Sequence, residues 1–597
     1  MKVDYTTWHP PLAEEPPALW GVAVAALLLY YAMTMAPFHY GGADSRFILL
    51  VSEALWERGT TTLDHYVERG ELDPDHYAIR AINGHHYYVY PLGTSLLSVP
   101  FVAMERLAGK RMVVDHSATQ QRLAALSCSA MLLALYALAR LFLPPLASGG
   151  LALVWGLGSS LVSSLGTTLL SHNFAVLFAL LALYGVALRL YRGGNVPVWS
   201  LGLALFLAYL CRPTMAVLTP LFMGLLLWHH QVWAALGVGI WVGLGLLALG
   251  GYAWLAFAAP LPPYYLPGLL AFADPGALEV VNFTPQVVAT DPKAPPLALY
   301  IHLLSPARGV LIYWPQLWLL PLALFLWPHL PARALGAMAL GWVVVQLGVL
   351  VSPLSHGFGG HAYGPRLMVD ALPGVYVLSV ITAKAVGDGG HGWRRGFWGG
   401  MALTGTIAIY FNLVQGVFNP YTQRWNEQPD IDYNLDYLGD WRYPPFWYDE
   451  RRHEERLVRH LRRRPPLAPV APGEVMDHRS SKVRFVGWSY PEMIHRWSEG
   501  HHAALILELA PGAAFEGRLA LRAWGLGDHR VEVYVGGQPL AQWQLTRGEV
   551  GDYSATLPPD ALAGETLVIA FRTPDALPPD AEDQRSLSMA LMEFSLH

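Results

Sequence analysis

Charged side chains are scarce in this sequence. Only 14% of its 597 residues are Asp, Glu, Lys or Arg, whereas 53% are hydrophobic. Soluble domains carry about 25% charged residues, so the shortage argues against a single soluble domain. Long apolar runs recur from Leu19 to Gly416, and polar residues return after them. We therefore expect a multi-pass membrane region followed by a soluble tail.

Cysteine is almost absent, since the chain has only Cys128 and Cys211. Both lie inside apolar segments, which argues against a disulfide framework and indicates two small buried residues. The first 18 residues contain charges and several prolines and lack a cleavable signal. The segment from Leu19 is therefore expected to remain as an uncleaved first transmembrane helix.

Several sequence motifs of soluble enzymes are also missing. We find no Walker A loop, GxSxG elbow or Rossmann fingerprint in a strand-turn-helix context, which argues against direct use of a nucleotide. His85, His86, His356 and His361 lack the helical spacing of a zinc motif, and no cysteine pair supports them. The sequence therefore predicts neither a metal nor another cofactor.

A membrane-spanning helix needs about 20 apolar residues. About eleven segments meet or approach that length. They lie near 19–37, 119–141, 148–168, 173–191, 198–211, 214–229, 233–256, 308–327, 334–352, 367–386 and 396–417. The apolar piece from Pro91 to Met104 is too short to span and contains a proline, so we expect a re-entrant or interfacial helix there.

The Lys/Arg bias of short loops predicts the orientation. Basic residues gather on one side if the N-terminus is cytoplasmic: Arg140, Arg189, Arg192, Arg333, Lys384, Arg394 and Arg395. The loops that hold Asp44, His172, Arg212, 257–306 and 353–366, and also the tail, then fall outside. The basic run 451–464 points the other way, but long polar segments are largely exempt from this rule. That run suits either anionic lipid headgroups or a solvated linker helix.

The sequence predicts three regions: a transmembrane domain over 1–418 with a long first outer loop at 38–117, an aromatic, acidic and then basic linker over 419–477, and an all-β domain over 478–597. Residues 505–509 and 530–535 alternate as strands do, and Gly536-Gly537 is a hairpin signal. Repeated short strands of this kind favour a jelly-roll-like β-sandwich.

The outer loops carry the motifs that suggest a function. ADSRF (43–47) is followed by an amphipathic helix, suited to the bilayer surface, and by NGHHYYVYPLGTSLL; SPARGVLIYWPQL (305–317) and HGFGGHAYGPRLMVDALP (356–373) come later. Together they resemble membrane glycosyltransferases of the GT-C superfamily, in particular bacterial relatives of protein O-mannosyltransferases and lipid A aminoarabinose transferases. The resemblance implies a GT-C fold and a sugar donor linked to polyprenyl phosphate.

Asp44 matches the first acid of the Asp-Glu pair in that family, where the acid serves as catalytic base or lies beside the metal or phosphate. Ser45 stands where the second acid would be, which weakens the case for a two-carboxylate or metal site. One carboxylate still suffices to deprotonate an acceptor hydroxyl. The alternative reading of Asp44 is a helix N-cap.

Arginines at the outer ends of helices can hold a phosphate, since each guanidinium offers a fork of donors. We expect this role for Arg308 and Arg366, with snorkelling to lipid headgroups as the alternative. Arg212 in CRPT suits a substrate contact or a break between two helices, and His172-Asn173 reads as an N-cap. Further candidate substrate or phosphate contacts are Arg46, His86, Tyr88, His356, His361 and Tyr363.

In the tail, aromatic residues could stack on sugar rings or simply fill the sandwich core. The candidates are Trp488, Tyr490, Trp497 and Trp524. Fold alone does not decide between these roles.

These features predict an inverting glycosyltransferase of the bacterial inner membrane. It would move a hexose or pentose from a polyprenyl-phosphate donor to a glycan, lipid or protein hydroxyl at the outer face, with membrane lipids and no nucleic acid as further partners. The alternatives are a transporter or flippase for a lipid-linked substrate and a non-catalytic, membrane-anchored glycan-binding protein. Internal repeats and charges near the bilayer midplane, which a transporter typically shows, are absent from the sequence.

Overall fold

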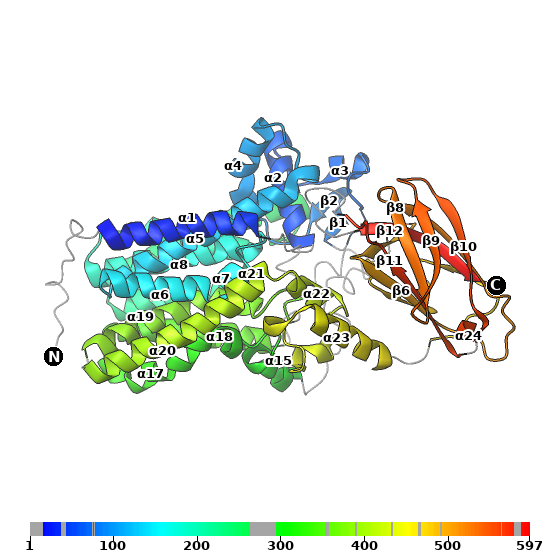
Figure 1. Ribbon diagram of the computed structural model, residues 1–597. Helices are drawn as coiled ribbons and strands as arrows, with labels where there is room; N and C mark the ends of the chain where they lie inside the picture. The colour runs from blue at the N-terminus through cyan, green and yellow to red at the C-terminus, as the bar shows by residue number, and fades with distance from the viewer. Residues whose placement is uncertain are drawn as a thin grey trace. The chain divides into compact units, whose positions relative to one another are not determined.

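The computed structural model describes residues 16–36, 43–74, 76, 78–262, 294–352, 358–388, 391–431, 434–463, 467–489, 492, 494–562, 564–577 and 587–597. The chain forms two compact units, Met1–Arg456 and Leu457–His597. The first is almost entirely helical and the second is a β-sandwich (Figure 1).

Six helical stretches of the described residues are long and apolar enough to cross a membrane. They are α5 (Met112–Arg140), α8 (Ser171–Arg192), α11 (Val232–Phe257), α18 (Arg333–Val351), η6 with α19 (Arg366–Ala371 and Leu372–Asp388), and α20 to α21 (His391–Ile409 to Gly416–Phe418). Five shorter apolar helices accompany them: α1 (Pro16–Met35), α6 (Pro145–Leu157), α9 (Val198–Cys211), η2 with α10 (Pro213–Val217 and Leu218–Trp228), and η4 with α17 (Pro315–Leu319 and Pro321–Phe325). These positions agree with the predicted segments, so the multi-pass helical fold is confirmed.

Two predicted spans are interrupted. The segment 148–168 breaks after α6, and the short α7 (Ser160–Ser163) follows, with the Ser159 hydroxyl accepting the Leu161 amide at its start. The segment 308–327 divides into α16 (Val310–Tyr313), η4, α17 and η5 (Trp327–His329). Proline lacks an amide hydrogen and clashes with the preceding turn, so Pro315 ends α16 and Pro321 ends η4, and each proline begins the next piece.

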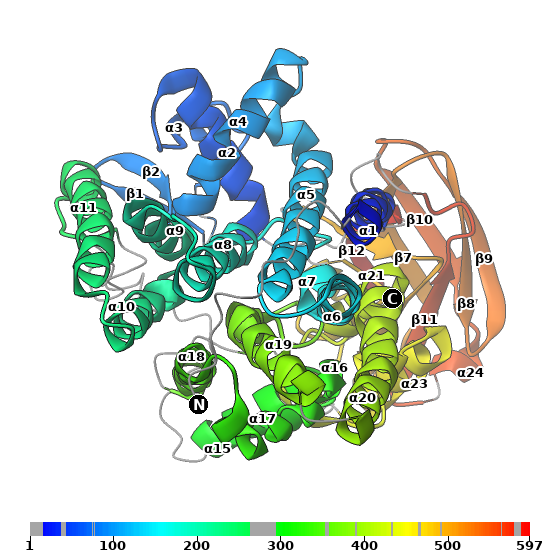
Figure 2. The ribbon, with the colours of Figure 1, turned by 90° about the vertical axis from the view of Figure 1, so that its left-hand side faces the viewer.

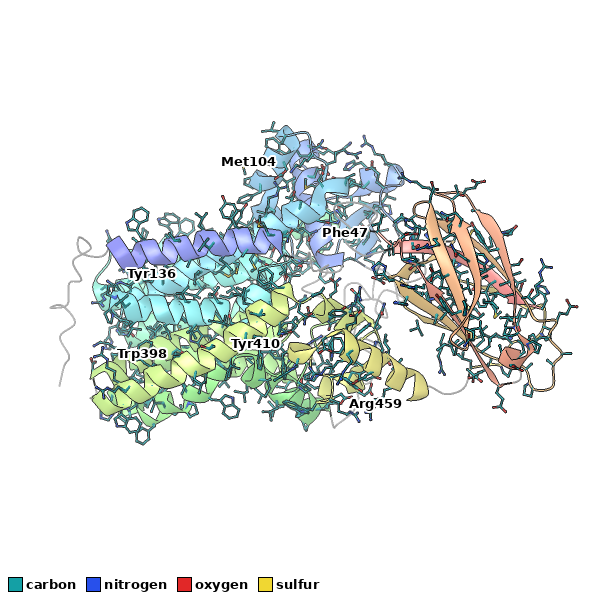
Figure 3. All side chains as sticks on the ribbon, viewed as in Figure 1. Phe47, Met104, Tyr136, Trp398, Tyr410 and Arg459 are labelled. Carbon is teal, nitrogen blue, oxygen red and sulfur yellow. The ribbon has the colours of Figure 1, made fainter. Side chains whose placement is uncertain are left out.

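The first outer loop folds into α2 (Ala43–Arg58), α3 (Asp64–Glu68), the hairpin β1 (Ile79–Ile82) and β2 (His85–Tyr88), and α4 (Gly93–Leu107). The expectation that α2 rests on the bilayer surface is wrong. Its apolar face, from Phe47 to Ala54, is buried against α4 and α5. Amphipathicity shows that a face is buried but does not distinguish lipid from protein. The loop's exposed large apolar side chains include Trp56 in α2 and Met104 and Leu107 in α4, and Figure 3 labels Met104.

A buried glutamate fixes this loop to the bundle. Glu53 accepts hydrogen bonds from the Tyr66 hydroxyl (2.6 Å) and the Met112 amide (3.1 Å), and it lies 3.2 Å from the Arg106 guanidinium. A buried carboxylate needs such partners. The contacts join α2, α3, α4 and the start of α5.

A second carboxylate holds the hairpin. Asp64 accepts hydrogen bonds from the His86 amide (2.6 Å) and from the Nδ1 atoms of His85 (2.8 Å) and His86 (3.1 Å). Partial burial raises the pKa of Asp64, but these hydrogen bonds outweigh it and hold the pKa below its usual value. The ionised carboxylate therefore supports the hairpin.

A π-helical turn, η7 (Tyr410–Gln415), interrupts the last long helix. Asn412 in this turn bonds with the Ser163 hydroxyl (3.0 Å) and donates to the Tyr313 carbonyl (2.7 Å), so it joins α7 and α16. The Tyr363 hydroxyl donates to the Phe411 carbonyl (2.6 Å). Beyond the turn, Gly416 lies so close to Ser163 and Tyr363 that an added Cβ would stand 2.6 and 2.7 Å from their carbon atoms.

The region after the last span forms α22 (Tyr421–Glu427), η8 (Leu435–Gly439), η9 (Pro445–Trp447) and α23 (Glu450–Arg463), beside α15 (Ala294–Leu304). The basic helix α23 is anchored by Arg456, which is fully buried. Its guanidinium lies 4.4 to 5.9 Å from the ring centroids of Trp425, Tyr437 and Tyr448 and donates to the Trp425 carbonyl. These cation–π contacts give at least one basic residue of the run a packing role.

The second unit contains two five-stranded sheets. One has the order β10-β7-β12-β3, with β5 also paired to β12, and the other has the order β4-β6-β11-β8-β9. The strands are β3 (Val475–Asp477), β4 (Val483–Val486), β5 (Arg496–Glu499), β6 (His502–Glu508), β7 (Arg518–Gly525), β8 (His529–Val535), β9 (Gln538–Leu545), β10 (Gly551–Thr556), β11 (Thr566–Arg572) and β12 (Leu587–Leu596); a short helix, α24 (Pro559–Leu562), precedes β11. Gly536 and Gly537 both have positive φ and turn β8 into β9, as the sequence predicts. The sheets also include β3, which lies before residue 478, the predicted start of the all-β domain.

Replacement of Gly416 by alanine should destabilise the helical unit by about 1–3 kcal/mol, because the added methyl overpacks the contact with Ser163 and Tyr363. Gly399 in α20 is the matched control, since an added Cβ there meets nothing within 4 Å. Thermal unfolding in detergent should give a lower Tm for Gly416→Ala and an unchanged or higher Tm for Gly399→Ala. Equal Tm values would contradict the close packing.

The Asp64 carboxylate should make the hairpin sensitive to acid. Because its folded pKa lies below the unfolded value, its stabilising effect is present above that unfolded value and is lost as pH falls through the folded pKa. Hydrogen exchange should show declining protection of the His86 amide below about pH 3.9. Asp64→Asn should already show low protection at pH 7, whereas Glu71→Gln, which alters another ion pair of this loop, should not.

Candidate functional site

A fully buried carboxylate, Asp370, lies at the centre of the site. It accepts hydrogen bonds from His172 Nδ1 (2.6 Å), from Arg212 Nε (2.7 Å) and from the Thr214 hydroxyl (3.0 Å). Arg212 also donates through its terminal nitrogen to the Ser171 hydroxyl (3.1 Å). We call His172, Arg212, Thr214 and Asp370, together with Ser171, the Asp370 cluster.

Three helix ends supply the cluster. Ser171 and His172 begin α8, Arg212 and Thr214 lie where α9 gives way to η2, and Asp370 lies in η6. Figure 2 shows α8 between α9 and α19 in the bundle. The α9 helix ends at Cys211 because Arg212 has extended backbone and Pro213 follows it. The helix break that the sequence predicts at CRPT therefore also places the arginine.

The charges of the cluster favour an anion. Arg212 balances Asp370, and Arg366 lies close enough for its charge to act on the His172 ring. Arg212 and Arg366 are half-buried, whereas Asp370 is fully buried. Arg366 thus brings a second guanidinium near the Asp370 carboxylate, and the amino end of α8 adds a partial positive charge. Such a site can hold a phosphate group.

A close contact ties the first outer loop to the cluster. Gly93 begins α4 and lies against the backbone of Leu210 and Cys211, immediately before Arg212. An added Cβ at Gly93 would stand 2.5 Å from the Cys211 nitrogen and from the Leu210 carbonyl carbon, so only glycine allows this approach. The loop that contains Asp44 is therefore held beside the Arg212 end of α9.

Arg308 is fully buried and is fastened to two other segments. It donates to the Phe358 carbonyl (3.2 Å), the Gly360 carbonyl (2.7 Å) and the Asn426 side-chain oxygen (2.8 Å). These bonds fix the glycine loop, in which Gly359, Gly360 and Gly364 have positive φ. The observed contacts of Arg308 thus position the loop that leads to Arg366.

The same loop carries two more predicted residues. His361 Nε2 lies 2.9 Å from an oxygen of Asp430, and Tyr363 bonds to the Phe411 carbonyl in the π-turn. Burial, with Tyr313 and Tyr410 nearby, raises the pKa of Tyr363 far above its usual value, so this phenol acts as a hydrogen-bond donor and not as a base. The Ser164 hydroxyl donates to the Tyr363 carbonyl (3.1 Å), which ties the loop to the residues after α7.

The first-loop candidates lie in two places. Asp44 and Arg46 belong to the first turn of α2, but their side chains lie outside the described residues, as does all of His356. His86 is bound to Asp64, and Tyr88 packs against the rings of Phe47 and Tyr90. These contacts place His86 and Tyr88 in the hairpin and its junction with α2.

The candidate sugar-binding tryptophans are largely internal. Trp488 is a buried member of the sandwich core and donates to the Ala504 carbonyl (3.0 Å). Trp497 is buried in a smaller cluster, where its ring centroid lies 4.6 Å from that of Trp524. Tyr490 lies outside the described residues. The packing role that the sequence left open therefore accounts for Trp488.

Asp370 is not among the candidate residues that the sequence predicts, and His172 reads there only as an N-cap. Asp370 stands in an apolar stretch, RLMVDALP, where one acid at a helix start looks like an N-cap. The available signal was its isolation, because a single acid within a predicted span is a functional-site candidate. Among the described residues, no group of three His, Cys, Asp or Glu is arranged to hold a metal ion.

Comparisons with known proteins give distant likenesses. No family model matches the sequence, and no curated protein matches it. The solved arabinosyltransferase EmbB from Mycobacterium smegmatis is similar with a TM-score of 0.35 and 12% identity over 100% of this chain and 66% of that chain. An arabinoxylan arabinofuranohydrolase of glycoside hydrolase family 43 from Bacillus subtilis, solved with cellotetraose, matches 22% of this chain and 28% of its own at 7% identity and a TM-score of 0.15. This chain thus spans less than two thirds of either protein, and at such low TM-scores neither likeness assigns it a function.

Proposed function

We propose that the protein is a membrane glycosyltransferase of the GT-C type that takes its sugar from a polyprenyl-phosphate donor. The observation that carries this proposal is the Asp370 cluster. It gathers Arg212 and His172 from two of the loops predicted to lie outside, and Arg366, from a third, lies close enough for its charge to act on the His172 ring. A simple membrane anchor gives no reason for this convergence.

The reaction we propose is a single displacement at the anomeric carbon. Asp44 removes the proton from the acceptor hydroxyl, the acceptor oxygen forms a bond to the anomeric carbon, and the bond from that carbon to the phosphate oxygen breaks. The electron pair leaves on the polyprenyl phosphate, so the configuration inverts. Arg212 and Arg366 stabilise the charge that develops on the phosphate.

In this proposal, some of the other predicted residues position the groups that bind the donor, and the rest are predicted substrate contacts. Arg308, His361 and Tyr363 hold the glycine loop so that Arg366 reaches the phosphate. Gly93 keeps the Asp44 loop beside Arg212. Arg46, His86, Tyr88 and His356 remain predicted contacts, and no metal or other cofactor takes part in the scheme.

The proposed orientation in a bacterial inner membrane rests on the charge bias, and exposed tryptophans stand at both ends of the apolar helices. On the predicted cytoplasmic side they are Trp20 (67% exposed), Trp199 (50%), Trp228 (69%), Trp233 (86%) and Trp393 (58%), and on the predicted outer side Trp254 (65%) lies in the last turn of α11. Tryptophan is enriched where a membrane meets water. The opposite ends, which carry the Asp370 cluster, then face outward, where nucleotide sugars are absent and a lipid-linked donor suits the site.

Asp44→Asn should lower donor consumption by about 100-fold or more, because it removes the general base. The assay is turnover of a panel of polyprenyl-phosphate-linked hexoses and pentoses by purified protein in lipid nanodiscs. Asp115→Asn is the control, since this carboxylate of the first loop accepts only the Arg111 amide in the contacts observed.

Three outcomes separate the candidate functions. Loss of turnover in Asp44→Asn alone supports the transferase. Equal activity of wild type and Asp44→Asn would make Asp44 a helix cap and refute its role as base. Donor binding or movement across the membrane without turnover by the wild type would favour the glycan-binding or flippase alternatives.

Arg212→Lys should raise the KM for the donor by about tenfold or more, because lysine cannot bridge Asp370 and Ser171 with a rigid fork. Arg189→Lys is a matched control, since Arg189 also bridges two groups, Gln231 and the Val196 carbonyl, at the opposite end of α8. Similar KM values for both variants would show that Arg212 serves only the fold.

A further inference from the structure

His172 has a nitrogen that the cluster leaves unused. Its side chain is fully buried, and Nδ1 is committed to Asp370. The other ring nitrogen, Nε2, has no hydrogen-bond partner among the residues that the structure describes. A buried polar atom without a partner costs about 1–3 kcal/mol, so this arrangement is unfavourable unless a ligand or water completes it.

The surroundings of Nε2 favour a ligand. His172 lies in the first turn of the 22-residue helix α8, beside Ser171, which Arg212 contacts, and within the electrostatic reach of Arg366. The same turn therefore presents an unpaired buried nitrogen next to the groups proposed to hold a phosphate. A donor whose phosphate lay between the two arginines would bring its sugar close to this turn.

The chemistry of imidazole selects the group that Nε2 would contact. Since Nδ1 donates to Asp370, Nε2 is an acceptor in neutral histidine and a donor in the imidazolium form. A phosphate oxygen of a diester only accepts, and the arginines already suit it. A sugar hydroxyl both donates and accepts, so it pairs with Nε2 in either protonation state.

We infer that His172 Nε2 binds a ring hydroxyl of the transferred sugar, and that Asp370 acts as a positioning residue that sets both the imidazole and Arg212. This inference rests on the proposed function and extends it from the phosphate to the sugar. His172 then helps to choose the sugar, because a site built to bond a hydroxyl rejects an analogue that lacks it.

The test compares wild type with His172→Asn. The asparagine amide nitrogen can replace Nδ1 as a donor to Asp370, but nothing replaces Nε2, so the cluster is preserved while the proposed contact is removed. Both proteins are assayed with the donor that the wild type consumes best and with a series of its single-deoxy analogues. An unchanged Tm confirms that the variant folds.

For one deoxy analogue, wild-type kcat/KM should fall by about 10- to 100-fold. With the full donor, the kcat/KM of His172→Asn should be lower than that of the wild type by the same factor. With the deoxy analogue it should fall no further, because the two changes remove the same bond. His302→Asn is the control: His302 is also buried and also has an Nε2 without a hydrogen-bond partner among the described residues, but it lies outside the Asp370 cluster. With the deoxy analogue, the kcat/KM of His302→Asn should fall by the same factor as that of the wild type.

If His172→Asn discriminates against every deoxy analogue as strongly as the wild type, Nε2 contacts no sugar hydroxyl and the inference is overturned while the transferase stands. If His172→Asn fails to fold, His172→Gln is assayed in its place, because glutamine offers a group near Nε2. The inference then requires that the kcat/KM of His172→Gln falls when the deoxy analogue replaces the full donor. A wild type that neither binds nor consumes any donor of the panel overturns the proposed function and this inference together.

Discussion

The helical unit depends on how it accommodates one carboxylate away from water. Burial of an isolated charge costs several kcal/mol, and the cost is recovered only when partners surround it with good geometry. Asp370 therefore requires the start of α8, the end of α9 and η6 to meet at one point. Gly93 transmits this requirement to the first outer loop, because α4 can approach Cys211 only without a side chain there.

The membrane spans could be predicted because their signal is local. Each apolar run by itself predicts a helix, and the two glycines Gly536 and Gly537 are enough to predict the hairpin between β8 and β9. The contacts of the site are not local. Asp370 lies 198 residues from His172 and 158 from Arg212, and nothing in the residues around any of them specifies the other two. The broken helix near Ser159 was missed for a similar reason, since its polar groups are satisfied by distant partners such as Asn412.

Burial also changes what a residue type can be inferred to do. Arg308 and Arg212 look alike in sequence, as arginines near helix ends. In the structure, Arg308 donates hydrogen bonds to carbonyls of the glycine loop. Arg212 instead bridges the Asp370 carboxylate and the hydroxyl of Ser171, which begins α8. Trp488 shows the same limit, because an aromatic side chain suits a sugar face and a sandwich core equally well until its neighbours are known.

The π-turn at Tyr410–Gln415 also constrains the length of the chain. Such a turn holds one residue more than an α-helical turn, which shifts every later side chain by about 100° around the helix axis. Loss of any one residue from this stretch would leave an apolar helix of ordinary appearance, yet Gly416 would face away from Ser163 and Tyr363. Related chains should therefore vary in composition here while an alignment shows no gap across 410–416.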